Sequence, residues 1–118
     1  VTISTNAWLW VQGEAAASQT QAWYETRLQD LIDARLAGGC MGAGDLSLLG
    51  QIPADSGQYG ATVAAAKVAI AAAAPTTVEV LPYADYLLVD GIHMSARGQV
   101  QFAYDAFEQI FNVSHISM

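Results

Sequence analysis

Cysteine and basic residues are scarce in this chain. Among 118 residues there is one cysteine, Cys40, which excludes an internal disulfide and any zinc site built on a cysteine cluster. Lysine and arginine together number four, against eleven aspartates and glutamates, and the formal net charge is −7. The four basic residues are scattered, whereas binding to a phosphate backbone needs clustered cations. The composition therefore predicts no nucleic-acid partner.

Long hydrophobic runs are also missing. The most apolar stretch, residues 68–74, follows Lys67 and stops at Pro75, so it is too short to span a membrane. No block of like charge indicates a disordered tail. What the chain does have is a hydrophobic content of 53%, which can supply the core of one domain of this length. We therefore expect residues 1–118 to belong to a single domain.

Strand-like and helix-like segments alternate along the sequence. β-Branched and aromatic residues mark three strands, at 1–11, 45–52 and 77–82. A helix follows each of them: one between Ser18 and Gly38, one over 59–74, and one that begins at Ser95. This β-α-β-α-β-α order favours a parallel sheet with right-handed crossovers.

Helix ends and inward faces follow from the same pattern. Ser18 with Gln21 fits a capping box, Gly38 and Gly39 end the first helix, and Ser95 is a suitable N-cap for the last. The apolar spacing predicts which side of each helix faces the core. From the first helix to the last, the expected inward residues are Tyr24, Leu28, Leu31, Ile32 and Leu36; Val63, Ala66 and Ile70; and Val100, Ala103, Phe107, Ile110 and Phe111.

The first strand is apolar on both faces near its end, through Trp8, Leu9, Trp10 and Val11. Parallel sheets normally bury such strands on both faces and rarely leave a long apolar edge. Three strands would make a thin sheet, with this strand at its border. We therefore expect further strands beside residues 8–11, supplied by another chain or by another part of the same protein.

Polar residues follow the third strand at a place where parallel α/β sheets form their sites, beyond the carboxyl ends of the strands. In Asp90-Gly91-Ile92-His93, a tight turn at Gly91 lets the carboxylate meet the imidazole three residues ahead. Asp90 could then orient one ring nitrogen of His93 and leave the other to act as a general base. The alternative is that Asp90 only caps a turn and His93 is a surface residue near the helix start.

A second polar segment, Gln12-Gly13-Glu14, follows the first strand at the same expected edge of the sheet. The side-chain amide of Gln12 could donate to a developing oxyanion. Glu14 could orient the loop or favour a helix N-terminus. The alternative is that these are ordinary loop residues.

Together the two segments resemble one enzyme superfamily. W-V-Q-G-E at 10–14 is similar to the W-x-Q-G-E segment of the sialic-acid-esterase-like, carbohydrate-esterase branch of the SGNH (GDSL) hydrolases. D-G-I-H-M-S-A-R-G at 90–98 is similar to that superfamily's final block, D-G-x-H-x-S-x-x-G. The resemblance covers residues 6–111 and the C-terminal part of such a domain. It implies an α/β fold, a flavodoxin-like three-layer α/β/α sandwich with parallel strands in the order 2-1-3-4-5, of which this chain supplies the last three β-α units.

The resemblance also implies an activity. Members of the superfamily cleave esters, often acetyl groups on carbohydrates, by a serine mechanism that uses neither a metal nor a cofactor. Carried over residue by residue, His93 is the general base, Asp90 orients it, Gln12 is an oxyanion-hole side chain, and Gly13 and Glu14 support that block. We therefore expect the C-terminal portion of a serine esterase that acts on O-acylated carbohydrate and is partnered by the N-terminal part of the same domain.

The sequence departs from the superfamily pattern in two ways. The branch usually continues Q-G-E with a small residue and then an acid or amide, where this chain has Ala15 and Ala16. The nucleophilic serine, in a G-D-S or G-Q-S block, and an oxyanion glycine would both precede residue 1. Gly44-Asp45-Leu46-Ser47 echoes the nucleophile block but opens a strand instead of following one. Four other serines have no better case: Ser4 in a strand, Ser18 and Ser95 at helix caps, and Ser56 in a loop.

Two other classes of function stay open. A catalytically inactive SGNH-like domain could be a structural or glycan-binding module of a cell-surface or viral particle protein, and an extracellular, cell-surface or virion location would suit it. An independent three-stranded domain with an unrelated function is the third interpretation. His93 and His115 are too far apart in sequence to indicate a metal site. Trp23 and Tyr24 are interpreted as helix packing, with a platform for a sugar as the alternative. In the loop before Asp90, Tyr83, Asp85 and Tyr86 are interpreted as loop packing, with the lining of a substrate groove as the alternative.

Overall fold

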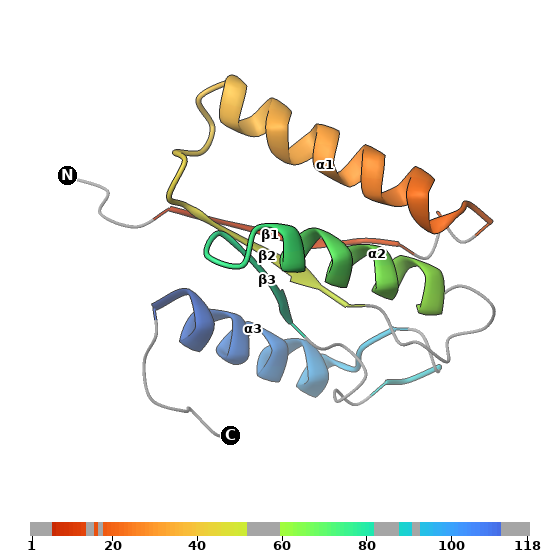
Figure 1. The fold of residues 1–118 in the computed structure, drawn as a ribbon. Coiled ribbons are helices and arrows are strands. Elements are labelled where there is room, and N and C mark those ends of the chain that lie inside the picture. The colour runs from red at the N-terminus through yellow and green to blue at the C-terminus, as the bar shows by residue number, and fades with distance from the viewer. Residues whose placement is uncertain are drawn as a thin grey trace.

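The structure, a computed structural model, describes residues 6–13, 16, 18–51, 60–81, 88–90 and 93–111. Strands and helices alternate along this part of the chain (Figure 1): β1 (Ala7–Val11), α1 (Gln21–Ala37), β2 (Leu46–Gly50), α2 (Gly60–Ala73), β3 (Val78–Leu81) and α3 (Ala96–Phe111). The predicted alternation is confirmed. The first strand begins later than predicted, at Ala7, and residues 1–5 of that prediction lie outside the described part.

The strands form one parallel sheet in the order β1-β2-β3. Ala7 of β1 is in register with Leu46 of β2, and Ser47 of β2 with Val78 of β3. Because all strands run in the same direction, their carboxyl ends meet at one border of the sheet, which we call the carboxyl rim, formed at Val11, Gly50 and Leu81. All three helices begin at this end of the molecule (Figure 1), as parallel β-α units require.

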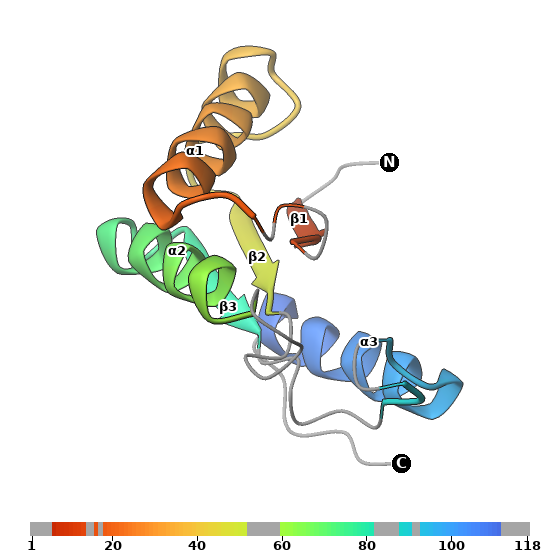
Figure 2. The same ribbon diagram turned by 90° about the vertical axis from the view of Figure 1, so that its right-hand side faces the viewer.

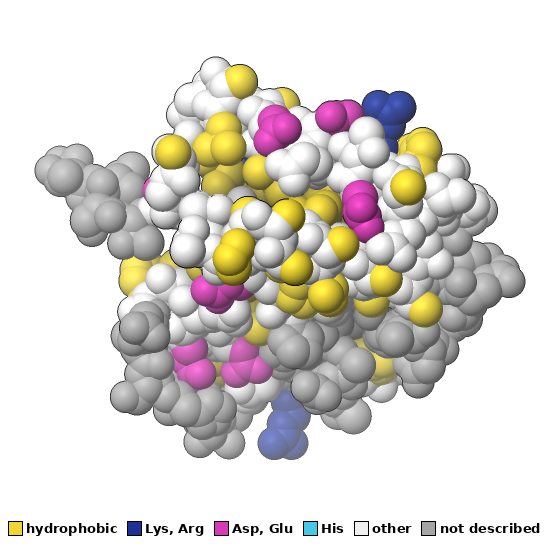
Figure 3. Space-filling model, viewed as in Figure 1, with side chains coloured by type: hydrophobic (Ala, Val, Ile, Leu, Met, Phe, Trp, Pro, Cys, Tyr) yellow, Lys and Arg dark blue, Asp and Glu magenta, His cyan; other side chains and the backbone are white. Residues whose placement is uncertain are grey.

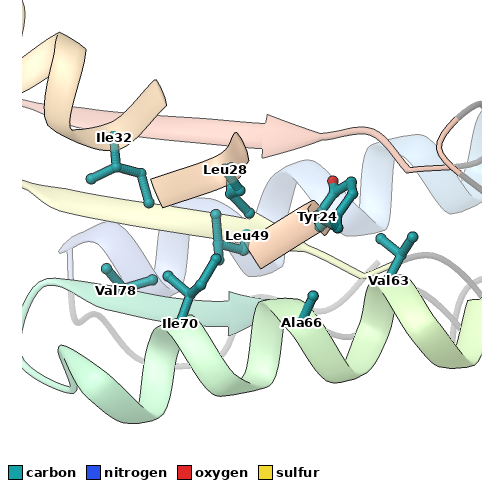
Figure 4. Packing of buried hydrophobic residues seen from close by; sticks show 8 residues of the cluster. All are labelled: Tyr24, Leu28, Ile32, Leu49, Val63, Ala66, Ile70 and Val78. Carbon is teal, nitrogen blue, oxygen red and sulfur yellow. The ribbon is translucent and has the colours of Figure 1, made fainter. Parts of the chain in front are cut away.

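Helices cover both faces of the sheet, with α1 and α2 on one side and α3 on the other (Figure 2). On the first side, one strand residue, Leu49, meets buried residues of both helices, and Figure 4 shows this packing. The buried members of this cluster are Tyr24, Leu28, Ile32, Leu49, Val63, Ala66, Ile70 and Val78. Because strand side chains alternate between faces, Leu48 points to the opposite side and packs with Leu81 and the α3 residues Phe102 and Ala106. The sequence therefore produces an α/β fold with a three-stranded parallel sheet.

Helix ends agree with the predictions at two of three positions. Gly38 is the C-cap of α1, and Gly39 follows in the left-handed region with φ of 76°, a conformation that glycine adopts easily. The Ser95 hydroxyl accepts a hydrogen bond from the Gly98 backbone at 3.0 Å, as an N-cap side chain does. The capping box at Ser18 is wrong, because the N-cap of α1 is Thr20, whose hydroxyl accepts from the Trp23 backbone at 3.1 Å.

The inward face of α3 differs from the prediction. Its buried residues are Gly98, Phe102 and Ala106, whereas Val100, Phe107 and Phe111 are 44–49% exposed. The helix carries two apolar stripes, and the stripe that contains Phe102 packs on the sheet. On the same side, the side chain of Gln109 donates a hydrogen bond to the Glu79 carboxylate of β3. The stripe of Val100, Phe107 and Phe111 is thereby left on the surface.

β1 is a border strand in the described part of the chain, paired only with β2. Leu9 and Val11 lie on the α3 side but are 41% and 42% exposed, because α3 packs over β2 and β3. Trp8 and Trp10, on the other side, are partly buried against the α1–α2 cluster. The border strand is therefore incompletely covered on both faces, and no strand lies beside it in the described part of the chain other than β2. The expected neighbouring strands stay a prediction.

Candidate active site

Asp90 and His93 lie next to each other where the chain approaches α3. The Asp90 Oδ2 atom is 2.6 Å from Nδ1 of the His93 ring, and Oδ1 accepts a hydrogen bond from the His93 backbone at 2.7 Å. An antiparallel bridge between Leu88 and Met94 closes the segment around this pair. The Val89 backbone also donates a hydrogen bond to the His93 carbonyl oxygen at 2.9 Å, so the residues on either side of the pair are joined to each other. Gly91, which the sequence analysis placed in this turn, lies outside the described residues, as do Tyr83, Asp85 and Tyr86.

This contact defines what the imidazole can do. With Nδ1 donating its hydrogen to the carboxylate, the proton-accepting lone pair of the neutral ring is on Nε2. The carboxylate also stabilises the imidazolium that forms when Nε2 takes a proton. The His93 side chain is 71% exposed, so the ring can be reached from outside this chain. The carboxylate therefore orients the ring, and the roles of His93 as general base and Asp90 as orienting acid stay predictions.

Gln12 and Gly13 follow β1 directly, at the carboxyl rim. The single hydrogen of the Tyr24 hydroxyl is shared between two oxygens of Gln12, the side-chain Oε1 at 3.1 Å and the backbone carbonyl at 3.0 Å. Trp10 donates its indole hydrogen to the Tyr24 oxygen over 3.4 Å. Gly13 is buried, and Glu14 lies outside the described residues. Tyr24 is part of the core, as predicted, and in addition holds the loop after β1.

Lys67 is a residue at this rim that the sequence analysis did not single out. Its side chain is fully buried, and Nζ donates to the carbonyl oxygens of Gln12 at 2.7 Å and Gly50 at 2.6 Å. These carbonyls end two neighbouring strands, so the ammonium group bridges the carboxyl ends of β1 and β2. A signal was present in the sequence, because position 67 is four residues after Val63 and three before Ile70, on the inward side of α2.

Both groups of residues lie at the end of the sheet where the helices begin (Figure 1). Gln12 follows β1, and the Asp90–His93 pair lies between β3 and α3. They share an end of the molecule, as expected for parallel β-α units.

Two of the described serines, Ser47 and Ser95, have contacts of their own hydroxyl groups. Ser47 is buried near the start of β2, at the opposite end of that strand from the rim, with its hydroxyl 3.9 Å from the Met41 sulfur. Ser95 caps α3 through its hydroxyl. Ser18 is exposed in the turn before α1. Ser4 and Ser56 lie outside the described residues.

Charge and metal-binding groups are dispersed over the described surface. On the face over α1 and α2, Lys and Arg side chains appear only near the margins, with acidic groups scattered among hydrophobic ones (Figure 3). No group of three or more His, Cys, Asp or Glu that could hold a metal ion occurs within the described ranges. None of the helices in that same part of the chain is long and apolar enough to cross a bilayer.

No protein-family model, curated protein or solved structure matches this chain.

Proposed function

We propose that this chain is the C-terminal part of a serine esterase that removes O-acyl groups, most simply acetyl, from carbohydrate. The observation that carries the proposal is the 2.6 Å contact between the Asp90 carboxylate and His93 Nδ1 at the entry to the last helix. The similarity of residues 10–14 and 90–98 to the SGNH hydrolases agrees with it. In this proposal the nucleophilic serine and one oxyanion glycine lie on the N-terminal part of the same domain.

The reaction would proceed through two transfers of the acyl group. Nε2 of His93 takes the proton of the serine hydroxyl while the serine oxygen attacks the ester carbonyl. The Gln12 amide donates to the oxyanion that develops on the carbonyl oxygen. His93 then returns the proton to the sugar oxygen as the C–O bond breaks, which leaves an acyl-enzyme. Water attacks the acyl-enzyme, again losing a proton to His93, and the carboxylic acid leaves as the serine hydroxyl is restored.

The surface around β1 supports the proposed partner. In the part of the chain that the structure describes, β1 pairs only with β2, Leu9 and Val11 are exposed on one face, and Trp8 and Trp10 are partly buried on the other. The apolar stripe of α3 lies uncovered on the same side as Leu9. A partner that buries all of these needs a strand to pair with β1 and helices on both faces of the sheet.

Two β-α units of an N-terminal part meet that requirement. Added beside β1, they would complete a flavodoxin-like three-layer sandwich, in which this chain holds the last three strands. They would also bring a serine to the carboxyl rim, because nucleophiles of parallel α/β folds follow the ends of strands.

The test uses the protein with its preceding polypeptide, expressed as one chain or as two associated chains. Release of acetate from an O-acetylated sugar, and labelling of one serine by a fluorophosphonate, are the expected results. His93→Ala should abolish both. Asp33→Asn is a matched control, because Asp33 is an exposed carboxylate of α1 whose side chain accepts only from Gln29 within the helix.

Three other outcomes would each contradict one part of this proposal. A turnover rate that survives His93→Ala would refute the assigned base. A preceding polypeptide without a G-D-S or G-Q-S serine after a strand would refute the nucleophile. Binding of the acetylated sugar with no release of acid would instead support the inactive glycan-binding module.

A further inference from the structure

Lys67 occupies an environment in which a lysine is rarely found. Its side chain has no exposed surface, and fully buried lysines are uncommon unless their ammonium group is hydrogen-bonded. Nζ is bound to the backbone oxygens of Gln12 and Gly50, which are 55 and 17 residues away in sequence. The ammonium group therefore joins three elements, β1, β2 and α2, at the carboxyl rim.

Gln12 is the residue on which these interactions converge. Its backbone oxygen is bound by Lys67 from the α2 side and by Tyr24 from the α1 side. The Tyr24 hydroxyl shares its one hydrogen between this backbone oxygen and the side-chain oxygen Oε1 of Gln12. A glutamine amide carries its oxygen and its NH2 group on opposite corners, so a partner on Oε1 directs the NH2 group away from Tyr24.

We propose that Lys67 and Tyr24 are positioning residues that fix the backbone and the amide orientation of Gln12, so that its NH2 group is presented at the carboxyl rim. Lys67 holds the backbone carbonyl of Gln12 and so fixes the position of its Cα atom. Tyr24 fixes the orientation of the Gln12 side-chain amide. Neither residue touches the substrate in this assignment. The catalytic part of this inference, donation of the NH2 group to an oxyanion, rests on the proposed function. The position of the Gln12 amide does not, because it can be measured without activity.

The kinetic test uses the assembled protein and a double-mutant cycle. Lys67→Met should lower kcat about tenfold or more with KM changed less than about twofold, since misplacing a catalytic group by about 1 Å can cost about 100-fold. In a Gln12→Ala background, Lys67→Met should have little further effect, because it acts through Gln12. Val68→Met is the matched control: it places the same side chain at the next position of α2, which is 54% exposed.

The second readout is the side-chain amide signal of Gln12 in a ¹H–¹⁵N NMR spectrum. We expect Lys67→Met and Tyr24→Phe to shift or broaden this signal and Val68→Met to leave it in place. Tyr24→Phe removes a single oxygen, so it provides the same comparison if Lys67→Met does not fold.

Two results would overturn the inference: equal losses of kcat from Lys67→Met with and without Gln12, or an amide signal that neither Lys67→Met nor Tyr24→Phe alters. A protein without ester hydrolysis, in which the amide signal still responds to both variants, would refute the proposed function and uphold the positioning role.

Discussion

Gly50, the last residue of β2, lies close to α3 and to β1, with little room for a side chain. A Cβ atom at this position would lie 2.9 Å from Cζ of Phe102 and 2.9 Å from Cγ2 of Val11. Carbon atoms in favourable contact are about 3.5–4.0 Å apart, so a methyl group would overlap α3 on one side and β1 on the other. Gly50→Ala therefore tests the docking of α3, which carries His93 at its entrance.

The expected loss of stability follows from two opposing effects. Overpacking of a well-packed site costs about 1–3 kcal/mol. Replacing glycine within a strand recovers roughly 0.5–1 kcal/mol of backbone entropy. We expect Gly50→Ala to reduce the free energy of unfolding by about 1–2 kcal/mol. The value within this range depends on how far the Phe102 ring can move to make room for the methyl group.

Urea unfolding of the intact protein, followed by tryptophan fluorescence, measures this change as a shift of the midpoint at constant m. Phe102→Leu removes the ring atoms nearest to the new methyl group, so the double variant should lose less than the sum of the two single losses, by about 0.5 kcal/mol or more. Gly44→Ala is the control, because a Cβ at Gly44 meets nothing within 4 Å. Additive losses, or a Gly50→Ala protein as stable as the parent, would refute this placement of α3 on β2.

Three further predictions concern the catalytic pair, the start of α1 and the border strand. Asp90→Asn in the assembled esterase should lower kcat by roughly 10⁴-fold with folding unchanged, as loss of the correct histidine tautomer does in Ser-His-Asp enzymes; a loss below about tenfold in steady-state hydrolysis would contradict the role of the carboxylate. Thr20→Ala removes the side-chain acceptor at the N-terminus of α1 and should cost about 1 kcal/mol in denaturant unfolding, whereas Ser18→Ala should be close to neutral. Val11→Lys places a charge on the exposed face of β1 and should weaken association with the N-terminal part at least about tenfold in a titration of the separate parts, which is about 1.4 kcal/mol; unchanged affinity would show that this face is not covered by the partner.

Much of the fold could be predicted because its signals are local. Apolar periodicity and β-branched runs placed the three strands and three helices close to their observed ends, except for the start of the first strand, which was predicted at residue 1 and lies at Ala7. The contact between Asp90 and His93 was also predictable, since three residues in a turn bring a carboxylate to an imidazole. The assignment of that pair as base and orienting acid, together with Gln12 as an oxyanion donor, stays a prediction.

The predictions that were wrong concern choices between similar local signals. Ser18 and Thr20 are both suitable caps, and only the direction in which the chain enters α1 selects Thr20. In α3, the stripes of Phe102 and Phe107 are both apolar, and each has helical spacing. The strand surface decides between them, because Gly50 leaves room for the Phe102 ring.

The sequence by itself determined the order of strands and helices, the end of α1 at Gly38, and the pairing of Asp90 with His93, because each depends on residues close together in the chain. The tertiary structure alone decided that Lys67 is buried, since the carbonyl oxygens of Gly50 and Gln12 that it binds are 17 and 55 residues away and become neighbours only when parallel strands end side by side. It also decided which stripe of α3 is covered and that β1 is a bare border, because burial depends on what packs against a surface, and sequence periodicity describes only the surface itself.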